Sequence, residues 1–90
     1  MAAEKQFENK IKKYLQDKGC WLVKFFANRM TSVGVPDILA CVNGWFVAVE
    51  VKAENGKMSK LQFYQMTKIL QAGGIHVLLY PDGFEDFKAL

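Results

Sequence analysis

The dipeptide Asn43–Gly44 constrains the fold of this chain more than any other feature. It separates two apolar, strand-like runs, Asp37–Val42 and Trp45–Lys52. Both turn residues tolerate positive φ angles, which favours a type I′ turn and a two-residue β-hairpin. Such a turn sets the register of the two strands, and counting outward places Asp37 opposite Glu50. The sequence therefore predicts two carboxylates that face each other across a pair of strands.

Both faces of this hairpin are largely apolar. One face carries Ile38, Ala40, Val42, Trp45, Val47, Val49 and Val51. The other carries Leu39, Cys41, Phe46 and Ala48, and it ends in Asp37, Glu50 and Lys52. A sheet that is apolar on both sides needs cover on both sides, which favours a layered α/β arrangement.

The rest of the chain predicts two longer helices and two further strands. The first helix is indicated by the helical spacing of its apolar residues, and the second by a capping-box pattern at Ser59 and Gln62. The strands are indicated by aromatic or β-branched runs. The predicted segments are a helix over Ala3–Lys18, a strand over Trp21–Ala27, a helix over Lys60–Ala72, a strand over Ile75–Tyr80 and a short terminal helix or tail over Phe84–Leu90. The expected order is α-β-β-β-α-β, in one domain that spans residues 1–90.

Composition excludes several classes of function. A chain of 90 residues has room for one small core, and a net charge of +3 permits a polyanionic partner without demanding one. Cys20 and Cys41 lie in apolar runs without metal-ligand spacing, so we expect small core residues and no zinc site. The single histidine, His76, argues against a Ser-His-Asp triad. Any chemistry should therefore use carboxylates and lysine. No apolar stretch reaches the ~18 residues of a membrane span, so we expect a cytoplasmic protein.

The facing carboxylates need a counter-charge. Opposed residues of an antiparallel pair have Cβ atoms roughly 4.5 to 5.5 Å apart, and like charges there destabilise the pair. Mg²⁺ or Mn²⁺ suits such a set of oxygen ligands and often shares its shell with phosphate. Lys52 lies two residues beyond Glu50, on the same face, where it can reach a water or phosphate on that ion. These groups equip a phosphodiesterase; the alternative is a turn residue at Asp37 and an exposed Glu50–Lys52 ion pair.

The motifs resemble the PD-(D/E)XK nuclease superfamily, and specifically its VRR-NUC branch, which includes small stand-alone phage members. The resemblance rests on Gly34-Val35-Pro36-Asp37, Glu50-Val51-Lys52 and Ser59-Lys60-Leu61-Gln62, with Glu8 on the preceding helix. It implies a restriction-endonuclease-like α/β domain, with a mixed sheet flanked by helices, and no nucleotide cofactor.

The resemblance also implies a role for each site residue. The expected metal ligands are Glu8, Asp37, Glu50 and the backbone carbonyl of Val51. Lys52 is expected to position or activate the attacking water, and Gln62 to complete the catalytic site. Taken alone, Glu8 is a solvated helix charge, and the capping box explains Gln62 almost as well. Gln65, one turn later, is the alternative site glutamine.

Other residues are expected to contact nucleic acid or a second copy of the chain. The expected DNA contacts are Arg29, Ser32, Lys57 and Lys60, through the backbone and shape of DNA and not through its bases. Large apolar residues exceed what a small core needs, which suggests a dimer interface. The candidates are Trp21, Phe25, Phe26, Phe63, Met66, Phe84 and Phe87.

The predicted function is a Mg²⁺- or Mn²⁺-dependent DNA endonuclease. By resemblance to resolvase-like relatives, it acts as a homodimer on branched DNA such as a Holliday junction. One alternative is a catalytically silent nucleic-acid-binding module, although such a module has no reason to keep a repelling carboxylate pair. Another is a nuclease with the same centre that acts on other DNA or on RNA, since specificity lies in loops and dimer geometry.

Overall fold

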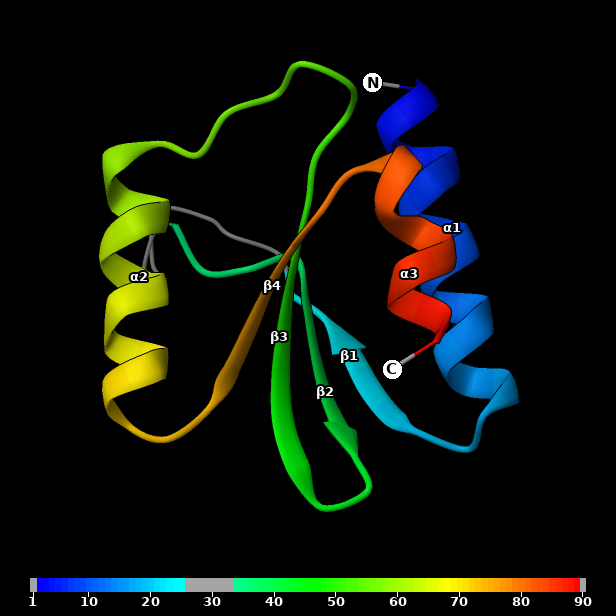
Figure 1. Ribbon diagram of the computed structural model, residues 1–90, viewed down its shortest axis with the longest axis horizontal. Helices are drawn as coiled ribbons and strands as arrows, with labels where there is room; N and C mark the ends of the chain where they lie inside the picture. The colour runs from blue at the N-terminus through cyan, green and yellow to red at the C-terminus, as the bar shows by residue number, and fades with distance from the viewer. Residues whose placement is uncertain (1, 26–33, 90) are drawn as a thin grey trace.

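A four-stranded sheet lies between two layers of helices in the computed structural model, which describes residues 2–25 and 34–89 (Figure 1). The elements are α1 (Ala2–Asp17), β1 (Trp21–Lys24), β2 (Ile38–Val42), β3 (Trp45–Val51), α2 (Lys60–Gln71), β4 (Ile75–Leu79), the 3₁₀ helix η1 (Pro81–Gly83) and α3 (Phe84–Lys88). The strand order is β1-β2-β3-β4, with α2 on one face of the sheet and α1 and α3 on the other. The predicted order α-β-β-β-α-β is confirmed.

The β2–β3 hairpin has the predicted register. Asn43 and Gly44 have φ angles of 51° and 86°, as a type I′ turn requires. Val42 pairs with Trp45, and the strands remain antiparallel as far as the pair Ile38 and Val49. β4 lies parallel to β3, reached through the crossover helix α2, so the sheet is mixed.

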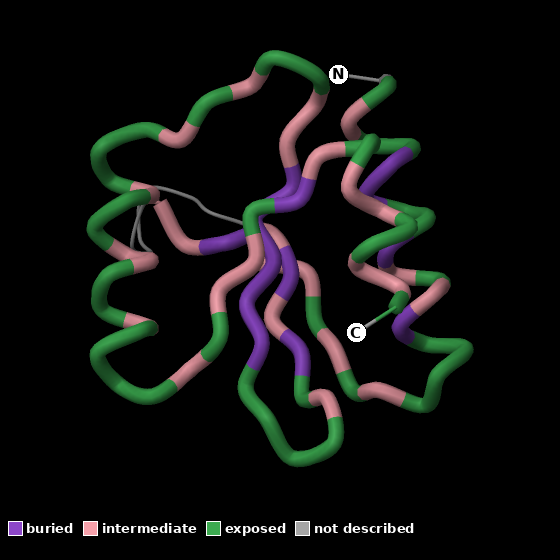
Figure 2. Tube along the Cα trace, in the orientation of Figure 1, coloured by how far each residue is buried: buried purple, intermediate pink, exposed green. Residues whose placement is uncertain are grey.

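The core lies between the sheet and the α1–α3 layer (Figure 2). Its buried members are Phe7, Ile11, Leu15, Ile38, Ala40, Val47, Val49, Val51 and Leu79. Phe84 of α3 packs edge-on against Phe7 and Tyr14, at centroid distances of 5.7 and 6.0 Å, and Phe87 lies 6.1 Å from Tyr14. The expectation that Phe84 and Phe87 are spare residues for a dimer interface is therefore wrong, because α3 uses them to cover the core.

The face under α2 is covered less completely. α2 has no buried residue, and Phe46 and Leu78 on that side of the sheet are exposed. Cys41 pairs with Phe46 next to the hairpin turn and is also exposed. The expectation that Cys41 is a core residue is wrong, because one helix lying on this face leaves the hairpin end of the sheet open.

The boundaries of the other elements differ from the predictions by a few residues. β1 ends at Lys24, short of the predicted end, and the expectations for Phe26, Arg29 and Ser32 lie outside the described residues. Gly19 has a φ of 82° after α1, as expected for a helix C-cap. Among the helices of the described ranges, none has the length and apolarity needed to cross a membrane.

Candidate active site

Asp37 and Glu50 meet at the end of the hairpin that is farthest from its turn. Asp37 lies one residue before β2, and its backbone carbonyl accepts a 2.9 Å hydrogen bond from the amide of Phe25. Its side-chain Oδ2 accepts a 2.7 Å bond from the amide of Val51. Asp37 is therefore held by the backbones on both sides of it, with its carboxylate beside Glu50.

Glu50 is a buried carboxylate with one unsatisfied oxygen. Its exposed fraction is 1%, and its Oε1 has no hydrogen-bond partner within the described part of the chain. Burial, reinforced by the charge of Asp37, raises the pKa of Glu50 to about 8. A buried, unpartnered carboxylate oxygen next to a second carboxylate is an environment that a hard divalent cation stabilises. The donor atoms present therefore fit Mg²⁺ or Mn²⁺.

Gln62 connects three parts of the site. Its Nε2 donates a 2.9 Å hydrogen bond to Oε2 of Glu50, and its Oε1 accepts a 3.0 Å bond from Nζ of Lys52. The same Oε1 accepts from the amide of Ser59 at 2.8 Å, while Ser59 Oγ accepts from the Gln62 amide at 3.1 Å. The capping box is thus confirmed, and it is compatible with a role in the site. Of the two glutamines that the sequence left open, Gln62 contacts both Glu50 and Lys52.

Gly34 explains how the start of α2 comes to the site. Its φ is 80°, and a Cβ at this position would lie 2.5 Å from the backbone carbon and oxygen of Leu61 and 2.8 Å from the amide of Gln62. Only glycine permits this close approach and this left-handed conformation together. The segment that leads to Asp37 is therefore packed directly on the first turn of α2.

Lys24, at the end of β1, connects Glu8 of α1 to this centre. Lys24 Nζ lies 3.0 Å from Glu8 Oε1 and 3.5 Å from Asp37 Oδ1. Lys5 and Lys12 each approach Glu8 Oε2 to 3.7 Å. Glu8 thus reaches the site through a lysine. Over the ranges 2–25 and 34–89, no three Asp, Glu, His or Cys side chains converge closely enough to hold a metal ion among themselves.

Lys24 is the residue that sequence reasoning missed. The available signal was one charge at the end of the otherwise apolar run Trp21–Val23. Its partner on β2 was not readable, because no short turn joins β1 to β2. Of the predicted DNA contacts, Lys57 and Lys60 are exposed beside the start of α2, and Arg29 and Ser32 lie in the range that is not described.

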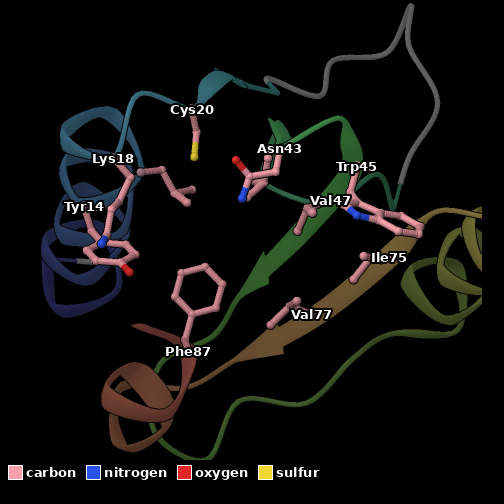
Figure 3. A pocket seen from close by; sticks show the side chains of 11 residues that line it. Tyr14, Lys18, Cys20, Asn43, Trp45, Val47, Ile75, Val77 and Phe87 are labelled. Carbon is pink, nitrogen blue, oxygen red and sulfur yellow. The ribbon is translucent and has the colours of Figure 1, made fainter. Parts of the chain in front are cut away.

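A hollow of about 480 Å³ lies at the opposite end of the sheet (Figure 3). It is bounded by the end of α1, the hairpin turn and α3, and Tyr14, Trp45 and Phe87 are among its lining residues. Among the described residues that line it, Lys18 alone carries a charge. The carboxylates of the described chain that lie side by side are those of Asp37 and Glu50, at the other end of the sheet.

The chain matches the model of a known protein family. A family model described as archaeal Holliday junction resolvase (hjc) matches residues 2–74. The matched range includes α1, the first three strands and α2, and with them Glu8, Asp37, Glu50, Lys52 and Gln62. Comparison with curated proteins gives no match.

Proposed function

Since the chain belongs to the archaeal Holliday junction resolvase family of nucleases, we propose that it is a Mg²⁺- or Mn²⁺-dependent endonuclease that cuts branched DNA as a homodimer. The observation that carries the proposal is the buried Oε1 of Glu50, without a partner and beside Asp37. A structural carboxylate pair would place its repelling oxygens in solvent or on a fixed donor. Here Glu50 is buried and one of its oxygens is unsatisfied beside Asp37, which suits the binding of a cation.

The proposed ligands are the carboxylates of Asp37 and Glu50 and the backbone carbonyl of Val51. The ion supplies Lewis-acid chemistry when bound, lowering the pKa of a water and offsetting phosphate charge. Lys52, held by Oε1 of Gln62, positions the attacking water and stabilises the charge that develops on the phosphate. Direct ligation by Glu8 stays a prediction of the resemblance.

A second copy of the chain is proposed because one copy has one such centre. The molecule measures 31 × 31 × 22 Å along its principal axes, which is too small for one centre to serve two strands of a junction. The outer face of α2 supplies an apolar surface for dimerisation. Its exposed apolar residues are Leu61, Phe63, Tyr64 and Leu70. A twofold pair would hold two centres at a set separation and select DNA strands that diverge to match.

The same proposal covers the type of domain, its origin and its location in the cell. The segments Gly34–Asp37, Glu50–Lys52 and Ser59–Gln62 support a single domain of VRR-NUC type. A phage-type origin rests on that resemblance. A location inside the cell follows from the proposed substrate, because branched DNA arises there.

The test is cleavage of a four-way DNA junction, with linear duplex and an RNA junction as competing substrates. We expect paired nicks on opposite strands of the DNA junction in the presence of Mn²⁺ and none in EDTA. Asp37→Asn should abolish cleavage and weaken Mn²⁺ binding measured by calorimetry. Asp17→Asn is the matched control, because Asp17 is an exposed carboxylate of α1 that pairs with Lys13, away from the site.

Three outcomes would contradict the proposal. Cleavage that persists in EDTA would exclude the metal centre. Binding of the junction without any cleavage would identify a silent binding module. A monomer that nicks linear and branched DNA equally well would leave only a generic nuclease.

A further inference from the structure

The ammonium group of Lys24 lies between two carboxylates, those of Glu8 and Asp37. Its Nζ bridges Glu8 Oε1 at 3.0 Å and Asp37 Oδ1 at 3.5 Å. The Lys24 side chain is 19% exposed and that of Glu8 is 6% exposed. The contact is therefore largely withdrawn from water, where an ion pair is screened weakly.

The backbone holds Lys24 in this place. β1 pairs with β2 so that Lys24 lies opposite Ile38, the residue that follows Asp37. The next amide, that of Phe25, donates to the backbone carbonyl of Asp37 at 2.9 Å. The backbone of Lys24 is thus fixed next to that of Asp37, and Glu8 comes from another layer, α1.

The charges around Glu8 oppose a metal ion there. Lys5 and Lys12 approach its second oxygen to 3.7 Å, in addition to Lys24 on the first. A divalent ion bound by Glu8 would meet three ammonium groups at close range. Around Glu50 carboxylates outnumber lysines, because the charges of Asp37 and Glu4 act on it against that of Lys52. One divalent ion at Glu50 and Asp37, with the ammonium of Lys24 at Glu8 and Asp37, matches the charge of these three carboxylates.

We propose that the ammonium group of Lys24 takes the place of a second metal ion, so that each chain binds one divalent cation, at Asp37 and Glu50. This inference rests on the metal centre of the proposed function. Lys24 acts as a positioning residue that keeps the Asp37 carboxylate in place and neutralises the buried Glu8. Glu8 then serves as the counter-charge of Lys24 and is not a metal ligand.

The first test uses the unmodified protein and Mn²⁺ alone. Calorimetric titration and equilibrium dialysis should give one Mn²⁺ per chain, with the electron paramagnetic resonance spectrum of an isolated ion. Two ions per chain, with the spectrum of a coupled Mn²⁺ pair, would overturn the inference on Lys24 and leave the nuclease assignment intact. No Mn²⁺ bound at all would overturn the proposed metal centre itself, and the inference with it.

The second test removes the bridging charge. Lys24→Met keeps the apolar stem of the side chain and opens the space between Glu8 and Asp37, so we expect two Mn²⁺ per chain and a coupled spectrum. Lys24→Arg, which keeps the cation, should return the count to one. The double variant Lys24→Met, Glu8→Gln should also bind one ion, because the second site has lost a ligand.

Lys12→Met is the matched control. It removes a lysine from the same Glu8 carboxylate, but one that does not bridge to Asp37. We expect the Lys12→Met variant to bind one Mn²⁺ per chain, as the unmodified protein does. If Lys24→Met retains its circular dichroism spectrum and still binds one ion, Lys24 does not block a second site and the inference is wrong. If that variant fails to fold, the ion count of the unmodified protein decides.

Discussion

The side-chain amide of Gln62 lies 2.9 Å from the carboxyl group of Glu50, Nε2 to Oε2, and joins the first turn of α2 to this buried side chain of the sheet. The other end of the amide is shared between Nζ of Lys52 and the amide of Ser59. One residue therefore caps a helix and aligns two groups of the site. A displacement of the helix start would misplace both groups.

Gln62→Ala should reduce kcat more than it reduces stability. Misplacement of catalytic groups by about 1 Å costs on the order of 10²-fold in rate, and this variant removes the contacts to both Glu50 and Lys52. Ser59→Ala is the control, because it removes the cap alone, at about 1 kcal/mol. Urea unfolding and single-turnover cleavage of both variants provide the comparison. Equal losses of rate in the two variants would mean that Gln62 acts on cleavage only by capping α2.

The stability of the metal-free protein should fall as the pH rises. Burial raises the pKa of Glu50 to about 8, so between pH 4.5 and 8 the folded state holds a proton that the unfolded state has lost. The contribution of Glu50 to stability is therefore complete below pH 4.5, the pKa of Glu50 in the unfolded state. It is lost as the pH rises through about 8, the pKa in the folded state. The slope is at most about 1.4 kcal/mol per pH unit.

Urea unfolding in EDTA from pH 5 to pH 9 measures this effect, and Glu50→Gln is the reference that lacks the titrating group. The difference between the two proteins isolates Glu50 from all other titrations. Mn²⁺ affinity should rise over the same pH range, because binding must displace the proton. Parallel stability curves for the two proteins would show that Glu50 is ionised throughout.

Lys52→Met should lower kcat by roughly 10² to 10³-fold, the usual effect of removing one group that stabilises transition-state charge. Junction affinity should change little, since several lysines hold the DNA backbone. Lys57→Met is the matched control, because Lys57 is exposed and should affect only affinity and its salt dependence. If Lys52→Met weakens binding and rate in proportion, Lys52 anchors the ground-state phosphate.

Gly34→Ala should be far more damaging than Gly19→Ala. Both glycines have nearly the same positive φ, 80° and 82°, so both variants incur the left-handed strain of ~1 to 2 kcal/mol. A Cβ at Gly34 meets the backbone of Leu61, whereas one at Gly19 has nothing within 4 Å. Thermal unfolding and cleavage assays should therefore show extra destabilisation and lost activity for Gly34→Ala. Equal stability and activity of the two variants would mean that α2 can move away from a Cβ at position 34 without loss of stability.

Leu70→Lys should convert the proposed dimer to a monomer. Leu70 is exposed near the end of α2 remote from Gln62, so the change leaves the centre intact. Sedimentation should show the monomer, and paired cuts should give way to single nicks. Trp21→Lys, on exposed β1, is the control and should remain dimeric. A Leu70→Lys protein that remains dimeric would place the interface elsewhere.

Local sequence patterns were enough to predict the β2–β3 hairpin and the start of α2. Asn43 and Gly44 favour only a few backbone conformations, so the turn alone set the pairing of β2 with β3 and brought Asp37 beside Glu50. The Ser59–Gln62 box likewise depends on neighbours three residues apart. These features were readable because each depends on residues that lie close together in the sequence.

The remaining features depend on how separate elements pack. The contact of Lys24 with Glu8 and Asp37 needs the placement of α1 and β1 on β2, and no short turn specifies it. The exposure of Cys41 depends on how much of the sheet α2 covers, and the fit of Gly34 depends on where α2 begins. Gln62 emerged as the glutamine at Glu50 for the same reason. Contacts between distant segments are selected by packing and charge in three dimensions, which a one-dimensional pattern does not contain.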